Sequence, residues 1–160
     1  MGEGDTTKID RGIELPPEQP LDTVASLATR AESAGFDTIL SSCHYFNRDP
    51  FVALSRIVEV TETVRVGPGV VNPYETHPVA LASRAATLQE ESGGRAVFGI
   101  GAGDASTLSA LGIERDRPLR RVLESFKIAR DLWGGESVEH DGAVSVTGAT
   151  LNYAVDPPPV

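Results

Sequence analysis

Short apolar segments alternate with amphipathic segments of helical period along this chain of 160 residues, and this alternation most constrains its fold. We expect a helix capped by Asp49 and another ended by Gly35. The expected strands are 11–15, 36–42, 64–71 and 95–104, and the expected helices are 20–34, 49–64, 77–94, 105–111 and 118–133. Strands that alternate with helices predict βαβ units, a parallel sheet and right-handed crossovers.

Two α/β architectures fit this order of elements. A small doubly wound sheet is complete at this length, whereas a (β/α)8 barrel needs about 250 residues, so the chain would form about half of one. Periodicity does not choose between them. The Asp141-Gly142 turn signal predicts a hairpin insertion at 138–151, and the charged segment 1–10 indicates a flexible leader before a domain at 11–160.

The composition argues against several classes of partner. The chain has 14 basic and 23 acidic residues, whereas nucleic-acid-binding proteins carry basic stripes, and anionic membrane surfaces also attract basic proteins. No apolar run approaches the ~20 residues that a membrane-spanning helix needs. Cys43 is the single cysteine, so an internal disulfide is impossible. We therefore expect a cytoplasmic protein with no nucleic-acid or membrane partner.

Titratable and amide side chains gather where the four expected strands end. In both architectures, the carboxyl ends of parallel strands form the face that binds ligands. The four ends read "GIELPP", "LSSCHYFNRDP", "GPGVVNPYETHP" and "GIGAGD". They supply the candidate site residues Glu14, Cys43, His44, Tyr45, Asn47, Gly69, Asn72, Tyr74, His77, Gly101, Gly103 and Asp104.

Each candidate also has a plainer interpretation. Glu14 can cap a neighbouring loop, His44 can be a buried histidine bonded to a backbone carbonyl, and Cys43 can fill the core. Tyr45 and Tyr74 can cover the core without touching a ligand.

The glycines of the fourth strand end do not make a Rossmann phosphate site. "GIGAGD" lacks the full G-x-G-x-x-G pattern, and Asp104 would repel a pyrophosphate. A metal site is not expected either, because the three histidines and one cysteine show no H-x-x-x-H or C-x-x-C spacing.

Taken together, the four strand ends resemble those of the bacterial-luciferase-like superfamily of (β/α)8 flavin and deazaflavin enzymes. Within it, they are most similar to the F420-dependent 5,10-methylenetetrahydromethanopterin reductases. The residues that carry the resemblance are "GIEL" (12–15), "HY" (44–45), "ALGIE" (110–114) and the block 61–104 that begins "TETVRVGPGVVNPYETHP". The resemblance implies the N-terminal half of a TIM barrel, with strands one to four and helices outside.

The resemblance also accounts for the Gly67-Pro68-Gly69 interruption of the third expected strand, which is unfavourable in a regular strand. It implies a bulge with a non-prolyl cis peptide, here Gly69–Val70, that supports the flat ring of a cofactor. The plainer alternative is an ordinary glycine bulge that closes the curvature of the barrel.

The implied reaction is hydride transfer from reduced F420 to the methylene group of a tetrahydropterin one-carbon carrier, which becomes a methyl group. The resemblance makes Glu14 the general acid that protonates a pterin nitrogen. Asp104 would orient the pterin or tune Glu14. The cofactor, F420 or alternatively FMN, would contact Cys43, His44, Gly69, Val70, Asn72, Gly101, Ala102 and Gly103.

The chain departs from the family pattern in two ways. Cys43 stands where the family usually has Asp, so a folate is an alternative to methanopterin as the carrier. The chain also stops where a fifth strand is expected, which suggests a truncated or split reductase that forms homo-oligomers or needs a complementary C-terminal half-barrel. The remaining alternatives are an FMN-dependent luciferase-like monooxygenase, an inactive half-barrel that acts only with a partner, and a small flavodoxin-like binding module.

Overall fold

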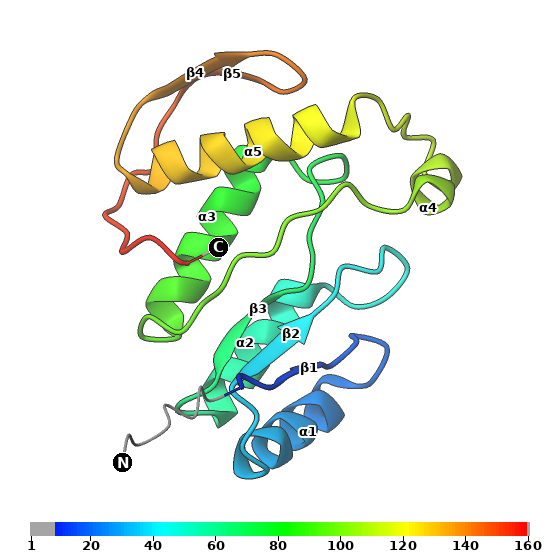
Figure 1. The fold of residues 1–160 in the computed structure, drawn as a ribbon, viewed down its shortest axis with the longest axis vertical. Coiled ribbons are helices and arrows are strands. Elements are labelled where there is room, and N and C mark those ends of the chain that lie inside the picture. The colour runs from blue at the N-terminus through cyan, green and yellow to red at the C-terminus, as the bar shows by residue number, and fades with distance from the viewer. Residues whose placement is uncertain (1–8, 160) are drawn as a thin grey trace, which may run out of the picture.

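The computed structural model describes residues 9–159, so residues 1–8 of the expected leader lie outside the described residues. Strands and helices alternate as predicted: β1 (Gly12–Glu14), α1 (Leu21–Ser33), β2 (Thr38–Ser41), α2 (Pro50–Val60), β3 (Arg65–Pro68) and α3 (Pro78–Glu91). The three strands form a parallel sheet in the order β1-β2-β3, and Ile39 lies opposite both Ile13 and Val66 (Figure 1). The predicted βαβ organisation is therefore confirmed.

The ends of the first two helices follow from local sequence. The side chain of Asp49 accepts hydrogen bonds from the backbone N–H groups of Phe51 and Val52, and Pro50 occupies the first turn of α2. Gly35 follows α1 with a φ of 78°, a left-handed conformation that glycine adopts at low cost. Apolar residues of α1 and α2 pack on the sheet around Ile39, which is fully buried.

A second core is formed by α3, α5 (Pro118–Trp133) and a hairpin of β4 (Val138–Asp141) and β5 (Ser145–Ala149), while α4 (Ala105–Ala110) contributes no residue to it. Figure 1 shows α5 lying between α3 and this hairpin. The indole N–H of Trp133 donates to the carbonyl of Ala82 in α3 at 2.9 Å. Its ring meets Phe98 edge to face, with centroids 5.3 Å apart. Trp133 therefore joins α5 to both α3 and segment 95–101.

The third and fourth expected strands are shorter and less regular than the sequence suggested. β3 ends at Pro68 because the chain bulges at Gly69–Val70, where the peptide bond is cis. Segment 95–104 was expected to be a continuous strand, but it pairs with the third strand only through bridges from Ala96 to Val66 and from Ile100 to Val71. The two bridges lie on either side of the bulge, which explains why the ladder is interrupted.

The last described residues lie beside this fourth segment. The N–H of Phe98 donates to the carbonyl of Pro159 at 3.1 Å, and Pro158 is buried. Within 9–159, no helix has both the length and the apolar character to cross a membrane.

Candidate functional site

A hollow of about 470 Å³ lies at the carboxyl ends of β2, β3 and segment 95–101. The family resemblance gave ten residues a catalytic or cofactor-binding role, and the hollow is lined by seven of them: Cys43, His44, Gly69, Val70, Asn72, Gly103 and Asp104. Its other lining residues are Ser42, Tyr45, Phe46, Asn47 and Thr107. Residues from three separate stretches of the chain, 42–47, 69–72 and 103–107, thus converge on one concave surface.

The three remaining candidates lie next to the hollow without lining it. Glu14, at the end of β1, accepts a hydrogen bond from the hydroxyl of Ser42, which does line the hollow. The N–H of Gly101 donates to the carbonyl of Val71 at 2.9 Å, and the carbonyl of Ala102 accepts from the Nε of Arg115 at 3.3 Å. Glu14 is therefore connected to the site through a serine that the sequence analysis did not select.

The bulge after β3 forms one wall of the hollow. A Cβ atom at Gly69 would lie 2.9 Å from the Cβ of Leu40, so glycine is required for this close approach. The carbonyl of Val70 accepts the N–H of Cys43 at 3.3 Å, which ties the bulge to the end of β2. The side chain of Val70 packs against Gly101 yet remains 43% exposed. Gly67-Pro68-Gly69 thus lets the backbone turn towards the hollow and present an apolar side chain there.

Asn72 organises the neighbouring loop and is itself 3% exposed. Its side-chain oxygen accepts the N–H groups of Tyr74 at 3.0 Å and Glu75 at 3.1 Å, and its amide nitrogen donates to the hydroxyl of Tyr45. The Tyr45 hydroxyl also lies against Gly103, whose φ of 67° and close contact both favour glycine. Much of the hydrogen-bonding capacity of Asn72 is therefore used within the protein, and Tyr45 is the polar group that it positions at the hollow.

The surroundings of the hollow raise the pKa values of two of its side chains, Tyr45 and Cys43. Burial, followed by the nearby Cys43, Glu75 and Asp104, raises the pKa of Tyr45 to about 12. Burial and the carboxylate of Glu75 likewise raise the pKa of Cys43 to about 12, and the thiol donates to Glu75 at 3.5 Å. At neutral pH the Cys43 thiol is therefore protonated and unsuited to act as a nucleophile.

Asp104 differs from Tyr45 and Cys43 because its pKa is lowered and not raised. Its carboxylate accepts hydrogen bonds from the Ser106 hydroxyl and from the N–H and hydroxyl of Thr107, all on Oδ2. The bond from Ser106 and those from Thr107 lower the pKa of Asp104 to about 2. Asp104 is thus a fixed anion at neutral pH that caps α4, and it can accept hydrogen bonds from a ligand but has no proton to donate.

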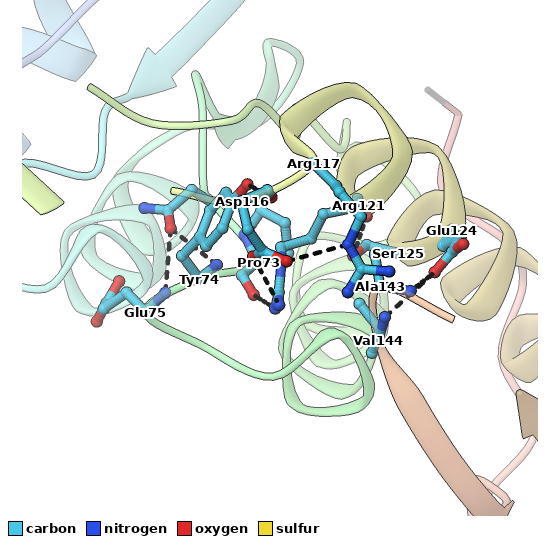
Figure 2. Close-up of polar contacts among 11 residues, drawn as sticks. Pro73, Tyr74, Glu75, Asp116, Arg117, Arg121, Glu124, Ser125, Ala143 and Val144 are labelled. Atoms are coloured by element: carbon cyan, nitrogen blue, oxygen red, sulfur yellow. Dashed lines mark hydrogen bonds and ion pairs between the residues drawn. The ribbon is translucent and has the colours of Figure 1, made fainter. Parts of the chain in front are cut away.

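Two further strand-end candidates lie outside the hollow. His77 caps α3 by accepting the N–H of Val79 at 3.3 Å. The hydroxyl of Tyr74 donates to the carbonyl of Asp116, while the guanidinium of Arg121 lies 4.6 Å from the centre of its ring (Figure 2). Four residues at or beside the hollow were not predicted from the sequence: Ser42, Phe46, Glu75 and Thr107. Ser42 and Phe46 adjoin predicted residues at the end of β2, and this was the available signal. The described part of the chain brings together no group of three metal-ligating side chains.

The chain is similar to proteins of one family along nearly its whole length. The family model described as luciferase-like monooxygenase matches residues 5–160. The 5,10-methylenetetrahydromethanopterin reductase of Archaeoglobus fulgidus is 40% identical over 143 residues, which are 89% of this chain and 43% of that protein. The reductase of the same name from Methanolobus tindarius is 36% identical over 150 residues, which are 93% of this chain and 46% of that protein.

Solved structures show the same likeness. A coenzyme F420-dependent tetrahydromethanopterin reductase from Methanopyrus kandleri superposes with a TM-score of 0.86 and 29% identity, covering 93% of this chain and 47% of that one. A monooxygenase from Streptomyces bottropensis superposes with a TM-score of 0.80 and 28% identity, covering 94% of this chain and 50% of that one. The chain thus spans about half the length of these proteins.

Proposed function

Because the chain belongs to the luciferase-like monooxygenase family and has the fold of one half of a TIM barrel, we propose that it is the N-terminal half of an F420-dependent oxidoreductase. The proposed reaction reduces the methylene group of a tetrahydropterin one-carbon carrier to a methyl group. The observation that carries this proposal is the hollow, because it is lined by seven of the ten residues to which the resemblance gave a catalytic or cofactor-binding role. The similarity to the 5,10-methylenetetrahydromethanopterin reductases of Archaeoglobus fulgidus and Methanolobus tindarius supports the choice of substrate.

The residues of the hollow fit a flat redox heterocycle. Val70 presents an apolar surface beside the backbone of Gly69, and a ring can lie against both. His44, the Tyr45 hydroxyl and the backbone of Gly103 line the same space and supply polar contacts for the edges of a ring. F420, when bound, supplies the hydride for the reaction. The chain supplies the shape of the site and its fixed charges.

Two carboxylates take different parts in the proposed mechanism. Glu14 is the general acid, and its Oε1 accepts a hydrogen bond from the hydroxyl of Ser42 at the edge of the hollow. Its proton would pass to a nitrogen of the pterin, which opens the one-carbon bridge for reduction. Asp104 stays charged and orients the substrate by accepting its N–H groups, a role that its depressed pKa of about 2 supports.

A titration of the chain with F420 and with FMN, followed by cofactor fluorescence, tests the proposal. It is run on the 160-residue chain alone and together with a polypeptide that supplies the remaining strands of the barrel. Saturable binding of F420 in preference to FMN supports the reductase. Preference for FMN favours the alternative, a luciferase-like monooxygenase. The similarity to the monooxygenase from Streptomyces bottropensis is the observation that supports this alternative. Binding of neither, in either form, favours an inactive fragment.

A substitution tests the role of Glu14 in the completed barrel. Glu14→Gln should lower the rate of methylene reduction by about 10²–10⁴-fold, the usual size of a general-acid contribution. Glu18→Gln is the matched control, because Glu18 is exposed on the loop after β1 and does not line the hollow. Near-normal turnover of Glu14→Gln would remove Glu14 from the acid role.

A further inference from the structure

The outer wall of the hollow is formed by a segment that packs weakly on the rest of the protein. Asp104 and Thr107 line the hollow from the start of α4. Of the six residues of α4, only Leu108 is buried, and Figure 1 shows the helix at the periphery between two extended connections. Gly103 and Gly112, on either side of the helix, have positive φ values of 67° and 71°. Few buried apolar contacts and glycines at both ends are the properties of a segment that opens locally at low cost.

A cluster of polar contacts holds the far end of this segment. The hydroxyl of Tyr74 donates to the carbonyl of Asp116, and Nη2 of Arg121 lies 3.4 Å from the Asp116 carboxylate (Figure 2). The same guanidinium stacks on the ring of Tyr74 at 4.6 Å and donates from Nη1 to the carbonyl of Pro73 at 3.4 Å. The side chain of Arg121 is 22% exposed, so these contacts are partly shielded from water. We call Tyr74, Asp116 and Arg121 the clamp.

The clamp is connected to the opposite side of the hollow. Tyr74 donates its N–H to the side chain of Asn72, and Asn72 in turn bonds the hydroxyl of Tyr45. That hydroxyl lies in the hollow and against Gly103, the residue at which the α4 segment begins. The loop after β3 thus bonds the far end of the α4 segment directly, through Tyr74 at Asp116. It reaches the start of the segment through Tyr45, whose hydroxyl bonds Asn72 and lies beside Gly103.

We infer that Tyr74 and Arg121 are positioning residues that hold segment 103–117 against the hollow and thereby set how tightly a flat ligand is bound. Neither side chain lines the hollow, so both act through the wall that carries Asp104 and Thr107. The inference rests on the proposed function for the identity of the ligand, but the closed position of the wall can be tested without any ligand.

Hydrogen exchange of the chain alone tests the clamp. Tyr74→Phe keeps the ring under Arg121 and removes only the hydroxyl that bonds Asp116. We expect the amides of residues 105–113 to exchange about fivefold faster, the effect of losing one hydrogen bond, while those of α3 and α5 keep their rates. Tyr153→Phe is the matched control, because its hydroxyl bonds Ser83 far from α4. Equal exchange at 105–113 in wild type and Tyr74→Phe would overturn the inference.

The affinity for F420 is a second test, because a general loss of protein stability would not change the affinity of the folded protein. Because a wall anchored by one buried leucine is only marginally closed, Tyr74→Phe should weaken F420 binding by about two- to fivefold. Arg121→Gln should weaken it by about 20-fold, with Arg130→Gln as the exposed control on the same helix. Unchanged affinity in both clamp variants would refute the link to ligand binding. If wild type binds no F420, the proposed function fails, and hydrogen exchange still decides whether the clamp exists.

Discussion

Replacing Gly103 by alanine tests whether the approach of Tyr45 to the fourth strand end organises the hollow. A Cβ at Gly103 would lie 2.7 Å from the Tyr45 hydroxyl, so the tyrosine must move and lose its bond from Asn72. That loss costs about 1 kcal/mol. The left-handed backbone, with a φ of 67°, adds about 1 kcal/mol for any residue with a side chain. We therefore expect Gly103→Ala to lower the free energy of unfolding by about 2 kcal/mol.

Gly112→Ala provides the matched control. Gly112 has a φ of 71°, but a Cβ there would meet no atom within 4 Å, so this variant carries only the backbone cost of about 1 kcal/mol. The change in the entropy of the unfolded chain is common to both substitutions and cancels in the comparison. Urea unfolding followed by the fluorescence of Trp133, the single tryptophan, measures both variants. Equal destabilisation by the two substitutions would refute the contact between Tyr45 and Gly103.

Three further predictions concern other parts of the structure. Burial raises the pKa of Glu124, but the bonds from Arg120, His140, Val144 and Ala143 outweigh it and lower this pKa to about 2. Its contribution to stability is therefore complete above pH 4.5, the ordinary pKa of a glutamate, and is lost as the pH falls towards 2. Acid unfolding curves of Glu124→Gln should therefore show a weaker dependence on pH in that window. Cys43, with a pKa raised from 9.0 to about 12, should react with a disulfide reagent at pH 8 at least a hundredfold more slowly than an unstructured cysteine, and rapid labelling of the folded chain would contradict its burial. Trp133→Phe removes the bond to Ala82 and leaves a cavity, so unfolding followed by circular dichroism should show a loss of about 2 kcal/mol, and an unchanged midpoint would argue against the packing of α5 on α3.

The parts of the fold that local sequence controls could be predicted from it. The cap by Asp49 and the left-handed Gly35 depend on residues close to the helix ends that they serve, and both are present. The cis bond at Gly69–Val70 agrees with what the resemblance to a family implied. The prediction of a continuous fourth strand at 95–104 was wrong, because the pairing of this strand depends on the position of the bulge in the neighbouring strand. The periodicity of 95–104 carries no information about that bulge.

The sequence predicted where the site lies better than it predicted which side chains contact one another there. Strand ends identified the hollow, but nothing local to Tyr74 shows that its hydroxyl reaches Asp116, 42 positions away. Asn72 was selected as a cofactor contact, and its carboxamide is largely occupied by Tyr45 and by two backbone N–H groups. Side chains of this kind have identical sequence signatures whether they face a ligand or the protein, so only the three-dimensional structure separates the two.

The hydrogen bond from the N–H of Phe98 to the carbonyl of Pro159 places the last described residues beside segment 95–101, and this position bears on self-association. Residues 157–159 are three consecutive prolines, and prolines carry no backbone N–H with which to extend a ladder of strands. Exposed sheet edges are the usual templates for amyloid-like growth, and a run of prolines along such an edge blocks it. A strand that approached this part of the protein would therefore find no N–H donors on residues 157–159.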